Sequence, residues 1–95
     1  MLIRIVKMEF QEALIPDFKT LFEEVSPKIR QFEGCIHLEL WQDQNNPAIV
    51  FTHSHWQTPE NLENYRQSDF FADTWSKTKK LFGGKPKAWS VDRIG

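Results

Sequence analysis

Apolar residues recur along the 95-residue chain with two periods, which predict strands and helices in alternation. Positions 2–10 are rich in Ile, Val and Leu, as is typical of a strand. Apolar and polar residues alternate from Ile36 to Trp41, with Ile36, Leu38 and Leu40 on one face, which predicts a second strand. Segments 48–56 and 88–94 predict two more, and the turn-forming residues 43–47 join the second and third strands into a hairpin.

A helical stripe follows the first strand. It begins after Pro16, a residue suited to the first turn of a helix. Its members are Phe18, Leu21, Phe22, Val25, Ile29 and Phe32. Pro27 lies inside the stripe and predicts a kink or break, because it removes the hydrogen bond to Glu23. Gly34 is expected to end the helix.

Two shorter helices are predicted between the third and fourth strands. Thr58 caps the first, Ser68 or Asp69 caps the second, and Gly83-Gly84 closes the second. The resulting order of strand, helix, strand, strand, helices and strand is that of the ferredoxin-like split βαβ fold. We therefore predict a single α+β domain over residues 1–95, with a four-stranded antiparallel sheet and helices on one face.

The predicted strands are apolar on both faces, although helices on one side can cover only one face. In the first strand Ile5 opposes Val6, and in the last Trp89 opposes Ala88. An uncovered face of this kind would be a larger apolar patch than monomers usually carry. The simplest cover is a second copy, sheet against sheet, so we predict a homodimer that forms a dimeric α+β barrel.

Composition and charge exclude several classes of function. A formal net charge of -1 gives no reason to expect binding to nucleic acid or to an anionic membrane. The single Cys35 cannot form an internal disulfide, and no segment has a leader pattern or transmembrane length, so we expect a cytoplasmic protein. Nucleotide-binding glycine motifs and a nucleophile elbow are absent. The high aromatic share of 14% points instead to a ligand pocket or an aromatic core.

One face of the third strand carries the best candidate site. Trp56 shares this face with Thr52 and Ser54, and a simple hairpin register turns it toward the helices. A pocket there would be walled by aromatic side chains: Trp56, Phe22, Tyr65, Phe70, Phe71 and Trp75. Its few polar groups would be Thr52, Ser54 and Tyr65. The alternative is that the aromatic residues only fill the core, because a chain of this length needs most of its large side chains for packing.

The three histidines form a second candidate group. With a turn centred near Asn45, His37 lies opposite His53, and His55 follows on the same face, turned away from the helices. Three imidazoles can hold a metal ion with one open position, but we prefer to interpret them as polar or stacked side chains at a dimer seam or barrel mouth. A one-residue slip in register would separate them, so we expect neither a metal nor a cofactor.

Three stretches of the chain follow a known pattern in order and spacing. They are the segment 32–40 with Glu33-Gly34-Cys35, the strand end His55-Trp56, and the run 62–71. They resemble the E-G-C entry, the E-x-W strand end and the L-x-x-H-x-x-S-x-H-F segment of the antibiotic biosynthesis monooxygenase family. The resemblance covers nearly the whole chain and implies a dimeric barrel of split βαβ units. It also implies oxidation of aromatic phenols or quinols without a cofactor, or haem degradation, although some members have no established reaction.

Several positions depart from the family pattern. Tyr65 and Phe70 replace both histidines of the L-x-x-H-x-x-S-x-H-F segment. In the phenol oxygenases the strand Trp works beside an Asn four residues earlier, where this chain has Thr52. The haem-degrading branch has a Trp at the position of Tyr65 and a His at that of Trp75, so its iron ligand is absent here.

We therefore predict a cofactor-independent, monooxygenase-like protein that binds and oxidises a small aromatic phenol or quinol. Tyr65 would hydrogen-bond the phenolic oxygen and Trp56 would stack on the ring, with Thr52 beside them. No group on this face is an obvious base near neutral pH. The alternatives are a non-catalytic, dimeric module that binds a small ligand on the same scaffold, and haem binding or degradation.

Overall fold

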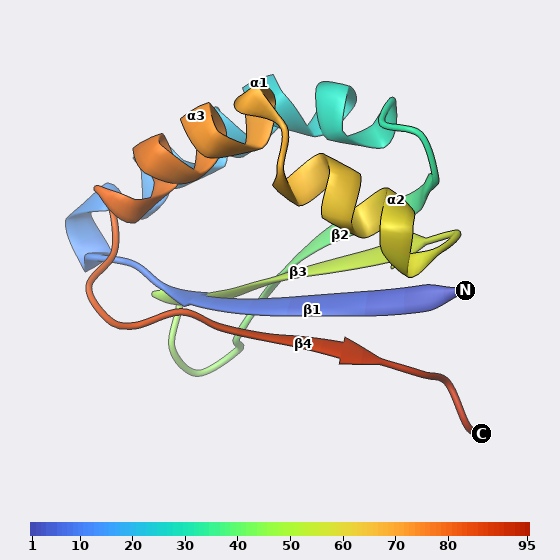
Figure 1. The fold of residues 1–95 in the computed structure, drawn as a ribbon. Coiled ribbons are helices and arrows are strands. Elements are labelled where there is room, and N and C mark those ends of the chain that lie inside the picture. Colours follow the sequence, from blue (N-terminus) through green and yellow to red (C-terminus); the bar gives the residue numbers. More distant parts are fainter.

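Helices cover one face of a four-stranded antiparallel sheet (Figure 1) in the computed structural model, which describes residues 1–95. In chain order the elements are β1 (Leu2–Glu9), a 3-10 turn η1 (Glu12–Leu14), α1 (Ile15–Arg30), β2 (Cys35–Gln42), β3 (Ile49–Trp56), α2 (Pro59–Arg66), α3 (Asp69–Lys79) and β4 (Lys87–Val91). The strand order is β2-β3-β1-β4, and all neighbouring strands are antiparallel. The predicted split βαβ architecture is therefore confirmed.

The hairpin of β2 and β3 pairs in a different register from the predicted one. His37 lies opposite His55, whereas the sequence placed it opposite His53. The turn explains the shift, because the Asp43 carboxylate accepts hydrogen bonds from the backbone N–H groups at positions 45 and 46, at 3.0 and 2.8 Å. The hairpin is thereby centred at position 46 rather than 45. Since every partner moves by two residues, each side chain stays on its predicted face.

An irregularity at the start of β2 displaces Ile36 from the core. The register shifts between Cys35 and His37, so that one residue of β2 has no partner. Cys35 packs against the core, while Ile36 is 55% exposed, although strict alternation placed Ile36 on the helix-covered face. Gly34 precedes this irregularity with a φ of +83°, a left-handed conformation that suits glycine.

The helix α1 runs without a break through Pro27 and ends at Arg30, so the break considered at Pro27 is wrong. Pro27 and Glu23 both lie on the exposed side, where water can satisfy the carbonyl group that loses its partner. The buried residues Phe18 and Ile29 hold the helix to the sheet on either side of the proline. Gly34 lies beyond the helix, in the turn that leads into β2.

The caps of the two shorter helices are confirmed, and the structure decides between the two candidates for the second. The Thr58 side chain accepts a hydrogen bond from the Asn61 N–H, and the Ser68 hydroxyl accepts one from the Phe71 N–H. Ser68, not Asp69, is therefore the cap. Gly83-Gly84 does not close α3, which ends at Lys79. Both glycine amides instead donate hydrogen bonds to the Glu9 carbonyl and tie this loop to β1.

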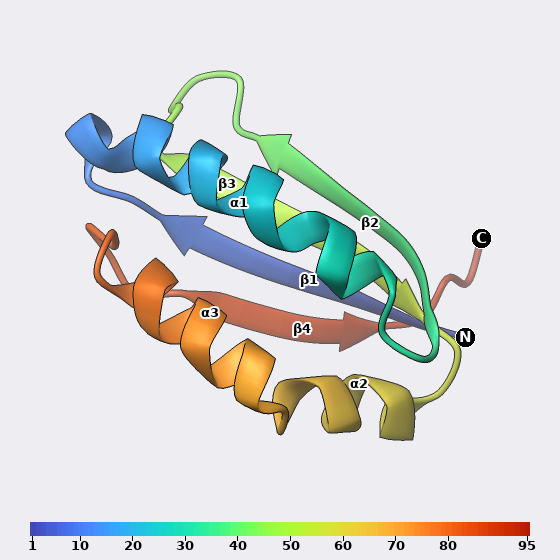
Figure 2. The same cartoon turned by 90° about the horizontal axis from the view of Figure 1, so that it is seen from above.

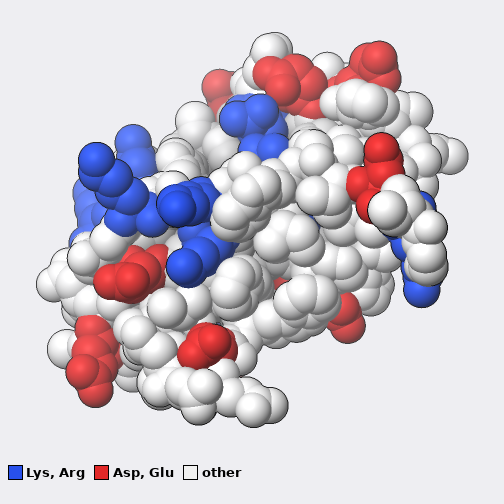
Figure 3. Space-filling view, turned by 90° about the horizontal axis from the view of Figure 1, so that it is seen from below, with Lys and Arg blue, Asp and Glu red and all other residues white.

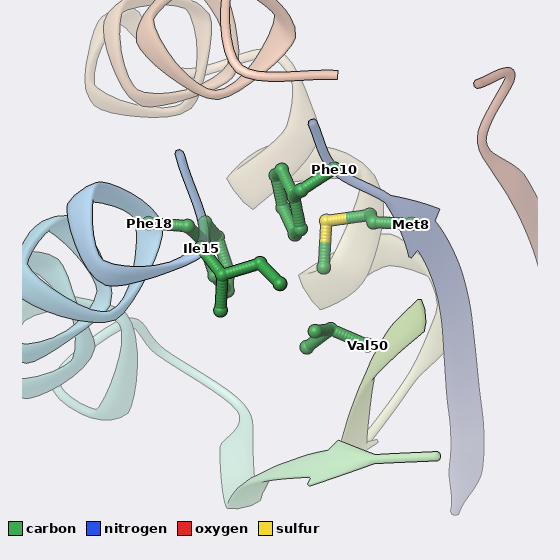
Figure 4. Close-up of a cluster of buried hydrophobic side chains, with 5 residues drawn as sticks. All are labelled: Met8, Phe10, Ile15, Phe18 and Val50. Carbon is green, nitrogen blue, oxygen red and sulfur yellow. The ribbon is translucent and has the colours of Figure 1, made fainter. Parts of the chain in front are cut away.

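The core consists of two clusters near opposite ends of the sheet. The first contains Met8, Phe10, Ile15, Phe18 and Val50, whose side chains converge between β1, β3 and α1 (Figure 4). The second contains Ile29, Leu38, Trp56, Leu62 and Tyr65. Phe22 of α1 packs against both clusters. Seen from above, α1 lies over the β3 side of the sheet, and α2 and α3 follow the β4 side (Figure 2).

The other face of the sheet is uncovered. Figure 3 looks onto this face and shows a broad uncharged area across its middle, with Lys, Arg, Asp and Glu mainly toward its margins. Trp41 and Trp89 are each 44% exposed, and Val91 is 39% exposed. We refer to this surface as the open face. No helix of the structure has both the length and the apolar character needed to cross a bilayer.

Candidate functional site

A cavity of about 280 Å³ lies between the sheet and the helices. Its wall is mostly apolar and is built from β1, β2, β3, all three helices and the segment 86–88. Trp56, Leu38 and Leu62 in this wall are buried, whereas Arg66, Lys87 and Ala88 are exposed, so the cavity opens to solvent on the β4 side of the sheet. Its volume is just below the roughly 300–1,000 Å³ of ligand pockets, so it suits a small ligand.

Most residues that the sequence singled out lie together in the wall of this cavity: Thr52, Ser54, Trp56, Phe22, Tyr65, Phe71 and Trp75. Phe70 does not. It packs beside Phe32, with ring centroids 5.7 Å apart, and the Lys28 ammonium lies 5.8 Å from its ring. Phe70 and Phe71 are neighbours in one helix and therefore point in different directions, and Phe71 takes the inward position.

Trp56 is 1% exposed and has a fixed orientation. Its indole Nε1 donates a hydrogen bond to the Ser54 hydroxyl at 3.0 Å. Its ring stacks on that of Tyr65, with centroids 5.1 Å apart and an interplanar angle of 23°. The Ser54 hydroxyl still has its own proton to donate. Trp56 is thus a core residue and a cavity wall at once, held rigidly enough to define the shape of the cavity.

Tyr65 is protonated near neutral pH. Burial raises the pKa of its phenol, and the neighbouring Cys35 adds to the effect. Burial also raises the pKa of the Cys35 thiol. Within this wall Tyr65 is therefore a hydrogen-bonding group rather than a base, and Cys35 has the properties of a structural thiol rather than a nucleophile.

Two arginines at the cavity were missed by the sequence reasoning. Arg4 pairs with Ser54 in the sheet, so it points toward the helices, and it lines the cavity together with Arg66. A signal existed, because Arg4 is the charged member of a row in β1 that otherwise reads Leu2, Val6 and Met8. A charge in an apolar row indicates a specific role.

The two arginines make one side of the cavity positive. Burial lowers the pKa of Arg4, the charge of Arg66 lowers it further, and Glu63 opposes both effects. Arg66 forms an exposed ion pair with Glu63 at 3.4 Å. Arg4 has no carboxylate partner and donates a hydrogen bond to the Ser90 hydroxyl at 3.0 Å. The Arg4 guanidinium is thus partly desolvated without a carboxylate in direct contact, a situation that a bound anion relieves.

The lining of the cavity contains no Asp, Glu or His. Its chemical resources are flat aromatic walls, the hydroxyls of Thr52, Ser54 and Tyr65, and the two guanidinium groups. Such a set can hold a small planar ligand with a negatively charged oxygen, and it can stabilise that charge. It offers no carboxylate or imidazole that could remove a proton.

The three histidines lie on the open face, outside this cavity. The structure brings all of them together, as expected, and adds Glu39, which the sequence reasoning missed. Glu39 lies opposite His53 in the register centred at position 46. Its carboxylate is within 3.2 Å of His37 and 3.3 Å of His53.

Comparison with known proteins gives a consistent picture. The family model for antibiotic biosynthesis monooxygenase matches residues 1–76. No curated protein matches the chain. A solved structure described as antibiotic biosynthesis monooxygenase superposes with a TM-score of 0.92 at 19% identity, covering 100% of both chains.

Two further solved structures share the fold. A conserved protein from Methanosarcina mazei Go1 has a TM-score of 0.91 and 20% identity, covering 99% of this chain and 94% of its own. A Pseudomonas aeruginosa protein has a TM-score of 0.85 and 16% identity, covering 99% and 94%. At these identities the structural likeness establishes the fold alone.

Proposed function

This chain belongs to the antibiotic biosynthesis monooxygenase family, and from that membership we propose that it oxidises a small aromatic phenol or quinol with molecular oxygen and without a cofactor. The observation that carries the proposal is the cavity beside Trp56, which combines aromatic walls with the positive charge of Arg4 and Arg66. A volume of about 280 Å³ favours ligands of one or two rings.

In the proposed complex the substrate ring packs in the apolar part of the cavity against Trp56. The phenolic oxygen faces Arg4 and Arg66, and the Tyr65 phenol, which stays protonated, donates a hydrogen bond to it. Two guanidinium groups lower the pKa of a bound phenol, because they favour its anion. Proton loss to water then takes the place of a protein base, which the cavity does not contain.

The reaction that follows uses the electron-rich ring of the substrate. The phenolate gives one electron to O₂, and the phenoxyl radical and superoxide combine at a ring carbon. One oxygen atom stays on the ring, and the other leaves as water with the hydrogens of the original O–H and C–H groups, so the phenol becomes a quinone. The protein contributes orientation, exclusion of water and stabilisation of the anion.

Oxygen consumption by the purified protein tests the proposal. A panel of hydroquinones, naphthols and anthrones is supplied without any cofactor, and products are identified by their quinone absorbance. We expect uptake with substrates of one or two rings and weaker uptake with larger ones. Trp56→Phe should weaken ligand binding and leave the fold largely intact, whereas a purely structural Trp56 would change stability alone.

The absence of a base among the lining residues favours a second candidate, a module that binds a small ligand without reaction. Calorimetric binding of the same phenols with no oxygen uptake would support this candidate and contradict the monooxygenase. Haem chemistry has less support, because Trp75 occupies the position of the iron ligand. A Soret shift on addition of haem would reverse that judgement.

We further propose that the functional unit is a cytoplasmic homodimer whose two open faces pack together. The side chains that support this pairing are apolar and lie in three strands of the open face: Ile3, Ile5, Phe51, Trp89 and Val91. Removing such an area from water is favourable at about 25 cal/mol per Å². The unpaired Cys35 suits a reducing compartment.

A further inference from the structure

A cluster of four titratable side chains lies on the open face of the β2–β3 hairpin, on the opposite side of the sheet from the cavity. It consists of His37, Glu39, His53 and His55, and we refer to it as the histidine cluster. Glu39 Oε1 lies 3.2 Å from His37 Nε2 and 3.3 Å from His53 Nδ1. The oxidation proposed for the cavity makes no use of these residues.

Two of the three distances between these ligand atoms match a tetrahedral metal site. When metal–ligand distances are about 2.0–2.1 Å, neighbouring ligand atoms of a tetrahedron are roughly 3.3 Å apart. The Glu39 oxygen already has this separation from both imidazole nitrogens. Ligand atoms of all three residues lie within 4.8 Å of one another, so a small rotation of the exposed His37 ring completes the set.

His55 contacts the ring nitrogen of His53 that does not face Glu39. Its Nε2 lies 3.2 Å from His53 Nε2, on the side of the His53 ring that points away from Glu39. If His53 Nδ1 binds a metal, its Nε2 carries the proton and donates a hydrogen bond to His55, as metal-bound histidines commonly do to a neighbour. The Trp41 ring stacks on His53 at 4.4 Å and further restricts its rotation.

We propose that His37, Glu39 and His53 bind one Zn²⁺ ion, with a water molecule in the fourth position and His55 orienting His53. Two imidazoles and a carboxylate favour a borderline divalent ion such as Zn²⁺ over Mg²⁺ or Ca²⁺, which prefer oxygen ligands. The site belongs to one chain and lies on the β2–β3 side of the open face, beside the apolar side chains proposed to pair in the homodimer. The sheet separates it from the cavity, so it does not depend on the activity proposed there.

Titration of the metal-free protein with Zn²⁺ against a chromophoric chelator tests the site. We expect one ion per chain, and Co²⁺ in place of Zn²⁺ should give the visible absorbance of a tetrahedral complex. Glu39→Gln and His53→Asn should each abolish tight binding, and His55→Gln should weaken it by about 10–100-fold, as loss of an orienting neighbour does. Glu60→Gln, on α2, is the matched control and should bind as the unaltered protein does.

Two results would overturn the site. One is the absence of a stoichiometric ion at micromolar protein concentration. The other is a Zn²⁺ affinity in Glu39→Gln equal to that of the unaltered protein. Glu39 is exposed, so this variant keeps its fold even if His53→Asn does not, and circular dichroism verifies it. Neither result bears on oxygen uptake in the cavity, so the two proposals stand or fall separately.

Discussion

Arg4 is the residue on which the chemistry proposed for the cavity most depends. It is a partly buried guanidinium without a carboxylate in direct contact, and the charge of Arg66 acts on it. Hydrogen bonds to charged groups contribute about 1.5–3 kcal/mol, which corresponds to roughly a tenfold to hundredfold effect. The affinity of the cavity for any anion should therefore depend strongly on the residue at position 4.

Replacement of Arg4 by Met should lower kcat/KM for a phenol by about tenfold or more. It should also move the rising limb of the pH profile to higher pH, because the bound phenol loses the charge that favours its anion. Arg4→Lys keeps the charge and should recover part of the rate. Arg93→Met, near the C-terminus, is the control. An unchanged pH profile in Arg4→Met would exclude the proposed role.

His55 makes stability depend on pH. Burial and the charges of His53 and His37 lower its pKa below the ordinary 6.5, while Glu39 opposes them and Arg93 adds to them. The unfolded chain then binds more protons than the folded one in the range just below pH 6.5. The contribution of neutral His55 to the free energy of unfolding is therefore fully present above about pH 6.5, the pKa of the unfolded chain. It is lost as the pH falls through the lower pKa that His55 has in the folded protein.

Urea unfolding between about pH 8 and pH 5 measures this dependence. We expect the free energy of unfolding to fall on acidification, and the fall to be smaller in His55→Gln, which does not titrate. Equal pH dependence in both proteins would show that His55 is not responsible. The comparison is made on metal-free protein, so that metal release does not contribute.

At the scale of elements, the connection between α1 and β2 depends on Gly34. Its φ of +83° costs other residues about 1–2 kcal/mol, and a Cβ here would overlap the Asn61 side chain. Asn61 belongs to the first turn of α2 and accepts a hydrogen bond from the Thr58 hydroxyl at 2.8 Å. The glycine therefore allows the first turn of α2 to pack closely against the turn that joins α1 to β2.

Gly34→Ala should lower the free energy of unfolding by about 2 kcal/mol or more, from backbone strain and the displacement of Asn61. Denaturant unfolding measures the loss. Gly95→Ala is the control, because a Cβ at Gly95 meets no atom within 4 Å. A loss below about half a kcal/mol would mean that the turn relaxes without cost.

Helix ends that are fixed by a capping side chain could be predicted from the sequence. Features that depend on contacts between distant parts of the chain could not. Thr58 and Ser68 act as caps through their own hydroxyls, which a sequence displays directly. The register of the hairpin depended on which turn Asp43 would stabilise, and composition alone does not decide this. The irregularity that exposes Ile36 and the continuity of α1 through Pro27 depend on packing and solvent exposure, which have no local signature.

For the whole molecule, the order of elements was sufficient to predict the architecture, and alternation placed most strand residues other than Ile36 on the correct face. The cavity was only partly predictable. Alternation along β3 placed Thr52, Ser54 and Trp56 correctly, but the orientation of Phe70 depended on helical phase. Arg4 was overlooked because a lone charge in an apolar strand was treated as part of the strand.

The proposed dimer makes a direct prediction. Light scattering at micromolar concentration should give twice the chain mass of 11.3 kDa. Ile5 lies between His53 and Trp89 in the middle of the open face, so Ile5→Glu should produce a monomer by burying a charge in the interface. Trp89→Glu, at an exposed position, is a second such variant, and Lys19→Glu on α1 is the control. Dimeric mass in both open-face variants would contradict the pairing.

The side chains of β3 point alternately to the two faces of the sheet, and this limits which mutations such a protein can tolerate. Thr52, Ser54 and Trp56 face the cavity, while His53 and His55 face the other way, so single substitutions can alter one side of the sheet and spare the other. An inserted or deleted codon within this strand would exchange the two sides at once. We expect relatives to tolerate length variation in the loop at 43–47 and in the segment 80–86, and to keep the length of β3 constant.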